Sequence, residues 1–308
     1  MNAPLFAAAL LIGGLLAVQA SVNLQLNRAV GTPYGASTLQ LGLAAVLLAV
    51  IAGLAGGWAV LGGLPDVPAW TLIGGIASPI YITSAILLFP RLGALASTGL
   101  FVTGQVVASL ALDVGGYLGV QQRSLSPGMA LGALAVVAGI VVVIRAQPAG
   151  AAAPTGRSQI PWLALGLVAG AVLPVQGAIN AALRGELHDA FAVAMISFIV
   201  ATAAIAVVLA MLLALRRTPA PRTAELHTVP WWGWLGGICA ATYVTVTFLL
   251  IPRIGAATTI ALTVTGQQLA SAAIDHFGWF RLPERAVSVA RIGGLAALGV
   301  GCALVQLA

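Results

Sequence analysis

Amide side chains recur inside long apolar segments of this sequence, where polar groups are scarce. Gln19, Asn23 and Asn27 are four residues apart, so they share one face of a helix. Hydrocarbon solvates polar groups poorly, and residues of this kind inside apolar segments are therefore candidates for a functional site. Because an amide both donates and accepts hydrogen bonds, this face suits the recognition of a polar solute.

The same chemistry recurs elsewhere in the chain. Gln176 and Asn180 repeat the first face, Gln105 and Gln267 lie on polar stripes of two other segments, and Tyr81 and Tyr243 add hydroxyl groups. We predict that these side chains line a central cavity, with the substrate-binding residues being Gln19, Asn23, Tyr81, Gln105, Gln176, Asn180, Tyr243 and Gln267. The alternative is that the amides join helix to helix as structural contacts, worth about 0.6–2 kcal/mol each.

Four charged residues are candidates for gating or coupling. Asp113 and Asp275 end their apolar segments, where a carboxylate caps an interface, pairs with an arginine at a gate or carries a coupled proton. Arg91 and Arg253 lie in short Pro-Arg-X-Gly joints, where they either anchor the chain at the membrane surface or form a gating contact.

The sequence contains no catalytic set. We find no Ser/His/Asp arrangement and no HExxH motif, and the three histidines and two cysteines lack the spacing of metal ligands. We therefore predict neither an enzyme nor a bound metal or cofactor.

An internal duplication explains why the polar residues come in pairs. Residues 74–113 align with residues 236–275 at an offset of 162, with half of the 40 positions identical. The segment VQASVN at 18–23 aligns with VQGAIN at 175–180 at an offset of 157. A duplicated apolar unit is typical of a membrane transporter.

Composition supports a membrane protein. Hydrophobic residues make up 60% of the 308 and charged residues 6%, far below the share in soluble domains. The net charge of +6 comes from scattered arginines without a basic patch, so we expect no nucleic-acid partner.

A helix of about 20 apolar residues crosses the hydrocarbon core of a bilayer. With this length as the criterion, we predict an all-α integral membrane protein with ten transmembrane helices. Residues 1–146 form a first five-helix repeat, 147–159 a Pro/Gly/Ala-rich linker, and 160–308 a second five-helix repeat. The predicted spans are 5–27, 35–60, 69–89, 94–114, 127–145, 161–183, 190–214, 231–251, 256–275 and 287–307.

An odd number of spans per repeat makes the second copy enter the membrane from the opposite side, which gives inverted repeats. Ten arginines then fall on the side away from the termini and three on the side of the termini. Arginine concentrates in cytoplasmic loops, so this distribution places both termini outside.

The motif PRIGAATTIALTVTGQQLASAAIDHFG at 252–278, its first copy around PRLG at 90–93, and the VQASVN and VQGAIN segments resemble the YdcZ-like branch of the drug/metabolite transporter superfamily. That branch has five-span proteins, so this chain resembles a fused pair. The first copy departs from the motif at Ser97, Thr98 and Val114–Gly115. The resemblance implies a ten-helix inverted-repeat fold, carriage of a small metabolite or toxic compound, and cytoplasmic termini, in conflict with the arginine distribution.

Together these features predict a secondary transporter of the bacterial cytoplasmic (inner) membrane. It would export a small polar or amphipathic organic metabolite by alternating access, with the lipid bilayer and a coupling proton or ion as partners. A passive channel lined by amides and hydroxyls is the alternative. The covalent pair makes a monomer sufficient, and a dimer stays open.

Overall fold

The structure, a computed structural model, describes residues 3–146, 159–254 and 256–307, and the described residues are helical with short loops. Residues 147–158 of the predicted linker lie outside the described residues. The long helices are α1 (Ala3–Val30), α2 (Pro33–Leu54), α3 (Ala77–Leu92), α4 (Ala94–Gly115), α5 (Pro127–Arg145), α6 (Ile160–Leu187), α7 (Ala190–Ala214), α8 (Leu235–Ile254), α9 (Ala256–Phe277) and α10 (Val289–Leu307). Shorter 3-10 segments are η1 (Gly57–Asp66), η2 (Ala69–Ile76), η3 (Tyr117–Gly119), η5 (Leu226–Thr228), η6 (Trp231–Trp234) and η7 (Trp279–Arg281).

Local sequence signals set several helix ends. Pro33 and Pro127 stand at the first position of α2 and α5, where the missing N–H costs nothing. The Asp189 carboxylate accepts a hydrogen bond from the Ala192 N–H at 2.8 Å and caps α7. Gly93, with φ of +84°, makes the turn between α3 and α4 that the Pro-Arg-Leu-Gly joint predicts.

Three predicted spans differ from the observed helices. The span 35–60 ends as α-helix at Leu54, and the spans 69–89 and 231–251 open with the 3-10 segments η2 and η6. Gly75 of η2 packs closely against α7, where an added Cβ would collide with the backbone carbonyl of Ser197. Apolar length alone does not report such a contact.

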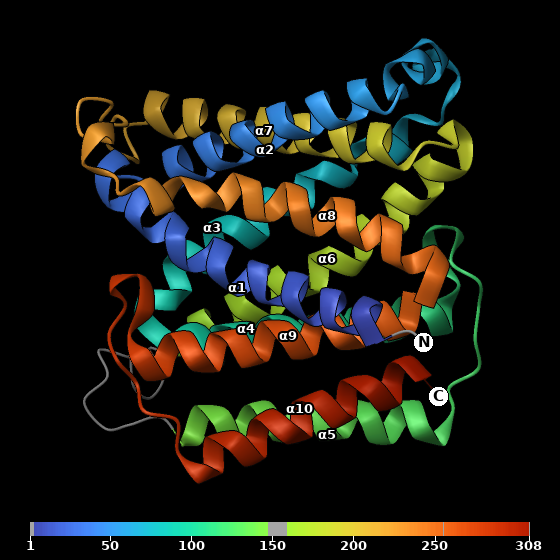
Figure 1. Ribbon diagram of the computed structural model, residues 1–308, viewed down its shortest axis with the longest axis vertical. Coiled ribbons are helices and arrows are strands. Elements are labelled where there is room, and N and C mark those ends of the chain that lie inside the picture. Colours follow the sequence, from blue (N-terminus) through green and yellow to red (C-terminus); the bar gives the residue numbers. More distant parts are fainter. Residues whose placement is uncertain (1–2, 147–158, 255, 308) are drawn as a thin grey trace.

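The two sequence repeats share one core, because the helices of each half pack mainly against helices of the other half. The main partners are α1 with α9 and α8, α6 with α4 and α3, α2 with α7, and α5 with α10. Figure 1 shows α2 and α7 at one edge of the molecule and α5 and α10 at the other, with the remaining helices between them.

Close glycine contacts repeat at equivalent positions of the two halves. A Cβ on Gly104 would collide with the carbonyl of Leu167, and a Cβ on Gly266, its equivalent, would collide with that of Leu10. Small residues at helix crossings let backbones approach, and this is how membrane helices associate without a hydrophobic drive. The reciprocity of these contacts relates the halves by an approximate two-fold axis.

The α5–α10 pair lies on that axis. Gly132 packs against Gly301 and Gly139 packs against Gly294, so the two helices run antiparallel. These helices are equivalent under the offset of 162, and a two-fold axis between equivalent antiparallel helices is perpendicular to them.

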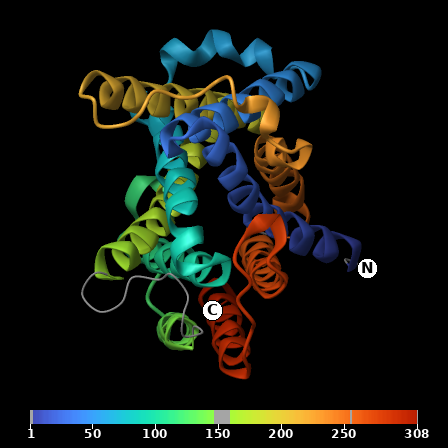
Figure 2. The same cartoon turned by 90° about the vertical axis from the view of Figure 1, so that its left-hand side faces the viewer.

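The long helices cross Figure 1 from one side to the other at various tilts, so the bundle has two ends, and Figure 2 views it from one of them. We call one the termini end, because α1 begins there and α10 ends there. The other, the arginine-rich end, contains the joints after α1, α3, α7 and α9.

Seven helical segments are long and apolar enough to cross a membrane: Ala3–Val30, Pro33–Leu54, Ala69–Leu92, Ala94–Gly115, Pro127–Arg145, Ile160–Leu187 and Ala190–Ala214. The segments α8, α9 and α10 are not among these seven within the described chain. The protein is therefore an all-α membrane protein, and the count of ten spans stays a prediction.

Candidate functional site

A tyrosine–glutamine pair from the two halves lies at the centre of the bundle. The Gln267 Nε2 of α9 donates a hydrogen bond to the Tyr81 hydroxyl of α3 at 3.0 Å, and both side chains are buried. The Tyr81 ring also packs against Phe101 of α4, with ring centroids 4.8 Å apart. Two of the predicted site residues are thus brought into direct contact between the halves.

A second polar cluster joins α6, α7 and α3. Gln176 Nε2 donates to the hydroxyls of Ser78 and Ser197 at 2.9 and 3.3 Å, and Asn180 Nδ2 donates to Ser197 at 3.1 Å. Gln176 and Asn180 are partly exposed. These amides connect helices, and each of them stays partly accessible.

The equivalent cluster in the first half is more deeply buried. Asn23 of α1 is 1% exposed, and Gln40 of α2, which aligns with Ser197 at the offset of 157, is 2% exposed. Gln40 Nε2 donates to the backbone carbonyl of Gly236 in α8 at 3.3 Å. Gln19 lies one turn before Asn23 on α1 and is also buried.

The remaining predicted site residues lie on the helices expected, with different burial. Gln105 of α4 and Tyr243 of α8 are partly exposed, whereas their equivalents Gln267 and Tyr81 are buried. The two halves therefore present the same residue types in unequal environments.

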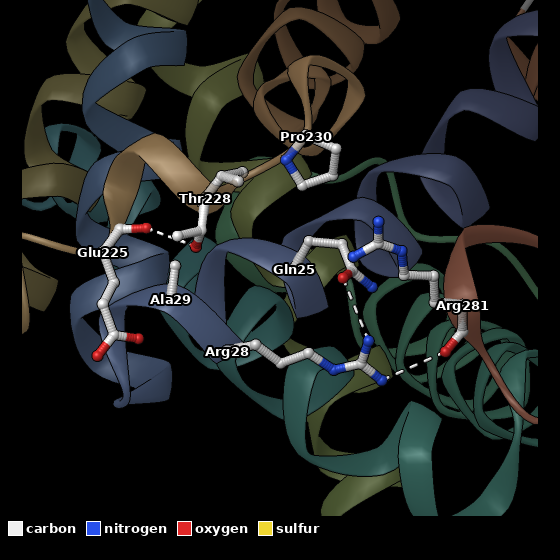
Figure 3. Close-up of a pocket in the computed structure, with 8 residues that line it drawn as sticks. Gln25, Arg28, Ala29, Glu225, Thr228, Pro230 and Arg281 are labelled. Carbon is white, nitrogen blue, oxygen red and sulfur yellow. Dashed lines mark hydrogen bonds between the residues drawn. The ribbon is translucent and has the colours of Figure 1, made fainter.

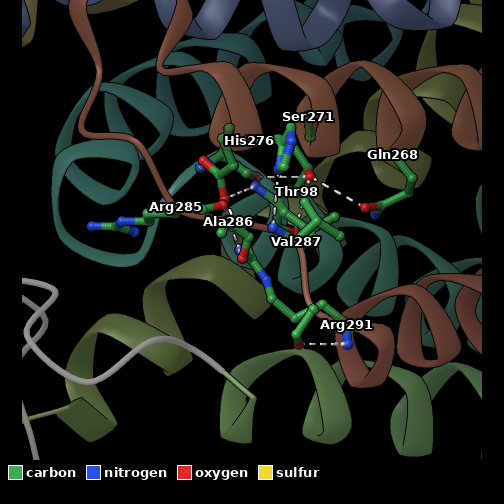
Figure 4. Close-up of polar contacts among 12 residues, drawn as sticks. Thr98, Gln268, Ser271, His276, Arg285, Ala286, Val287 and Arg291 are labelled. Atoms are coloured by element: carbon green, nitrogen blue, oxygen red, sulfur yellow. Dashed lines mark hydrogen bonds and ion pairs between the residues drawn. The ribbon is translucent and has the colours of Figure 1, made fainter.

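Asp275 forms a buried ion pair at the arginine-rich end. Its Oδ2 lies 2.8 Å from Arg291 Nη2, with both side chains at most 1% exposed. The same carboxylate accepts hydrogen bonds from the backbone N–H groups of Ala94 and Leu95 at 2.7 and 3.2 Å. Asp275 of the second half thus caps the first turn of α4 in the first half (Figure 4 shows Arg291 and the neighbouring polar residues of this region).

Arg285 completes this cluster, which we call the Asp275 cluster and define as Asp275, Arg285 and Arg291. Arg285 Nη2 donates to the carbonyl oxygens of Pro90 and Arg91 at 3.1 and 3.2 Å, at the end of α3. Burial lowers the pKa of Arg285 from its ordinary value, and the neighbouring Asp275 carboxylate opposes this shift. The cluster holds the α3–α4 joint to the segment after α9.

The equivalent position at the termini end lacks one of these charges. Arg123 aligns with Arg285, and its N–H donates to the Asp113 carbonyl at 2.8 Å, as the Arg285 N–H donates to the Asp275 carbonyl at 2.6 Å. Met129 takes the place of Arg291. Asp113 is partly exposed, whereas Asp275 is buried.

The two joint arginines differ as well. Arg91 Nη1 donates to the Leu87 carbonyl at 2.6 Å, and its guanidinium lies over the Trp162 ring of α6 at 4.2 Å, a cation–π contact between the halves. Arg253 is exposed. The structure therefore gives Arg91 a bridging position that its equivalent does not share.

A pocket of about 150 Å³ opens at the arginine-rich end (Figure 3). Gln25 Nε2 donates to the Phe280 carbonyl at 2.8 Å, and Arg28 donates to Gln25 Oε1 and to the Arg281 carbonyl, each at 3.2 Å. None of the predicted substrate-binding residues lines it; its lining residues are Gln25, Arg28, Ala29, Glu225, Thr228, Val229, Pro230 and Arg281. These bonds join α1 to the segment after α9.

Sequence reasoning missed several polar residues of the interior: Gln40, Ser78, Ser197, Gln268, Arg285 and Arg291. Gln268 Oε1 accepts a hydrogen bond from Thr98 at 3.4 Å (Figure 4). Gln40 and Gln268 are polar residues within apolar segments, as Gln19 and Gln267 are, so the same signal could have identified them.

Within the described residues, no three His, Cys, Asp or Glu side chains gather as metal ligands would.

The family profile described as "Putative inner membrane exporter, YdcZ" matches residues 4–142 and again residues 161–304. No curated protein matches the chain significantly. Ten chains of solved structures match, and one of these, titled only "Crystal structure of protein", aligns over 98% of this chain and 97% of its own at 20% identity and a TM-score of 0.58. That likeness supports the fold alone.

Proposed function

We propose that this chain, which belongs to the YdcZ family of inner membrane exporters in the drug/metabolite transporter superfamily, carries a small polar or amphipathic organic metabolite out of the cell by alternating access. The family is described as inner membrane exporters. That description favours a transporter over an enzyme. The double match, one to each half, agrees with a tandem of two five-helix units.

The observation that supports this mechanism is that equivalent residues of the two halves differ in burial. Asn23, Gln267, Tyr81 and Asp275 are buried, and their equivalents Asn180, Gln105, Tyr243 and Asp113 are partly exposed. In a transporter made of inverted repeats, each half adopts the conformation that the other half leaves when the cycle reverses. We assign this structure to a state closed at the arginine-rich end.

The antiparallel α5–α10 pair supports the inverted arrangement. If the helices span the bilayer, a two-fold axis perpendicular to them lies in the membrane plane, and ten spans follow. The arginine distribution then puts the arginine-rich end in the cytoplasm and both termini outside.

In this proposal the four glutamines Gln19, Gln105, Gln176 and Gln267 bind the solute near the midplane, aided by the hydroxyls of Tyr81 and Tyr243 and by Asn23 and Asn180. The Asp275 cluster and Arg91 close the cytoplasmic gate, and Asp113 and Arg253 belong to the opposite gate. A proton or ion couples the cycle, and one chain within the lipid bilayer suffices.

Cysteine labelling tests alternating access without knowledge of the solute. In a chain without Cys239 and Cys302, Ser97→Cys reports on the arginine-rich end and Ser78→Cys on the termini end; both serines are buried. With a membrane-impermeant maleimide on vesicles of both orientations, we expect conditions that raise labelling at one position to lower it at the other. Parallel labelling at both positions indicates a channel instead and contradicts the proposal.

The paired substitution Gln105→Ala and Gln267→Ala tests the binding site. It removes the equivalent midplane amides, and we expect solute binding to fall on the order of 10-fold to 100-fold, because each lost amide hydrogen bond contributes about 0.5–1.5 kcal/mol. A thermal-shift screen of purified protein first supplies a solute, and its titration against the variant gives the measurement. Unchanged affinity in a folded variant would show that these amides are structural.

A further inference from the structure

Three helices from both halves meet around one glycine. Asn23 of α1 and Gln40 of α2 both contact Gly236 of α8: a Cβ added there would collide with Asn23 Oδ1 and lie 3.1 Å from Gln40 Cγ. Both side chains are at least nine-tenths buried. Because Gly236 has no side chain, the amides of Asn23 and Gln40 can occupy the space beside it.

This cluster carries hydrogen-bonding capacity that the described protein groups do not use. Asn23 Oδ1, Asn23 Nδ2 and Gln40 Oε1 are buried without a hydrogen-bond partner among the described residues. The bond from Gln40 Nε2 to the Gly236 carbonyl fixes which end of that amide is free. A buried amide without partners is costly, so its retention in an apolar interior calls for an explanation.

The equivalent cluster in the second half shows that the fold does not require the unused groups. There Asn180 lies against Gly74 as Asn23 lies against Gly236, but the Ser197 hydroxyl accepts a hydrogen bond from Asn180. The two clusters differ at one of these positions, where the first half has Gln40 and the second half has Ser197, and they differ in burial, since Asn180 is partly exposed and Asn23 is buried. The Ser197 hydroxyl provides a hydrogen-bond partner for Asn180. Gln40 provides none for Asn23.

The unused groups define the chemistry of a ligand. Two acceptors, Asn23 Oδ1 and Gln40 Oε1, and one donor, Asn23 Nδ2, complement a group that offers two N–H donors beside one carbonyl acceptor. No charged side chain makes a hydrogen bond or an ion pair with either amide among the described residues, and the cluster lies at the start of α8, where the helix dipole disfavours a cation. A neutral group fits this environment better than an ammonium or a carboxylate.

We propose that Asn23, Gln40 and Gly236 form a subsite for a neutral carboxamide group of the transported solute. This inference rests on the proposed transport function, and it narrows the solute to molecules with a primary amide or urea-like end. Because Gly236 closes on Asn23 in this structure, the group enters as α8 separates from α1 and α2 when the arginine-rich end opens.

A set of four small probes tests the ligand chemistry by thermal shift on purified full-length protein. Acetamide has the required donors and acceptor, N,N-dimethylacetamide lacks the donors, acetate is charged and lacks them, and methylammonium has donors only. We expect a concentration-dependent rise in Tm with acetamide alone. Equal shifts with acetamide and N,N-dimethylacetamide, or no shift with acetamide, overturn the proposal.

The substitution Gln40→Ser gives the first half the residue of the second half. Its hydroxyl provides a partner for Asn23, so we expect the Tm without ligand to rise by about 2 °C and the acetamide shift to disappear. Asn23→Leu, a second variant, should also abolish the shift, and Gln122→Ser, which removes an amide from the loop after α4, should keep it. A fall in Tm for Gln40→Ser with an intact acetamide shift identifies Gln40 as a structural amide and contradicts the subsite.

Two measurements separate this proposal from the transport function. Reciprocal cysteine labelling with no acetamide response overturns the carboxamide subsite and leaves alternating access standing. An acetamide response without reciprocal labelling leaves the subsite and overturns alternating access.

Discussion

Arg291→Met is expected to open the arginine-rich end. The substitution leaves the Asp275 carboxylate buried without its 2.8 Å ion-pair partner, a loss that costs about 3–5 kcal/mol in comparable sites. Arg285 remains nearby, but it forms no ion pair with Asp275 within the described residues: its Nη2 is bonded to the carbonyls of Pro90 and Arg91, and its Nη1 has no hydrogen-bond partner. We therefore expect the labelling rate of Ser97→Cys from that end to rise on the order of 10²-fold, the equivalent of about 3 kcal/mol.

Two further variants make this result specific. Met129→Leu changes the equivalent position at the termini end, where no ion pair exists to break, and should leave labelling unchanged. Asp275→Asn combined with Arg291→Met removes both charges and should be less destabilised than Arg291→Met alone, because no carboxylate is then stranded. A fall in Tm with no change in Ser97→Cys labelling would make the ion pair a structural element only.

Gly104→Ala is expected to disrupt the packing between the halves. The added methyl group would collide with the Leu167 carbonyl, a backbone atom that moves only if α4 and α6 separate. Overpacking of this kind costs about 1–3 kcal/mol, and we expect the upper end of that range because the clash is with backbone. The measurement is the Tm and the fraction of monodisperse protein on size-exclusion chromatography, and Gly266→Ala should behave alike because it meets Leu10 in the equivalent crossing.

The chain offers matched controls for this prediction. Gly177 of α6 and Gly299 of α10 are helical glycines with no atom close to an added Cβ. Alanine at either position should preserve Tm or raise it slightly, since alanine favours a helix over glycine. If Gly104→Ala is as stable as Gly177→Ala, the helix crossings do not depend on their glycines.

The helices and the paired polar residues could be predicted because both leave local signals. Apolar length located the helical segments, and the duplication singled out Tyr81, Gln105 and Gln267 from generic polar residues. The joint at 90–93 could also be predicted, because proline fixes φ and glycine allows the positive φ that the turn requires.

The partners of these residues could not be predicted, because they depend on how the two halves interlock. Arg291 is one of the ten arginines assigned from the sequence to the side away from the termini. It lies in the first turn of α10, fully buried against Asp275. Gln40 lies outside the segments where the repeat is visible. The structure supports its equivalence to Ser197, because a Cβ on Gly237 would meet the Gln40 carbonyl as a Cβ on Gly75 would meet the Ser197 carbonyl. Unequal burial of equal residues is a property of one conformation, which a sequence does not specify.

The divergence of Arg291 from Met129 has a consequence for the direction of transport. Two identical five-helix chains associated in opposite orientations would place the same ion pair at both membrane faces. The protein itself would then favour neither face. Covalent fusion lets a mutation act on one half alone, so the buried ion pair between Asp275 and Arg291 has no counterpart at Met129. In the alternating-access cycle that we propose, this difference between the halves would favour one of the two facing states in the carrier without solute.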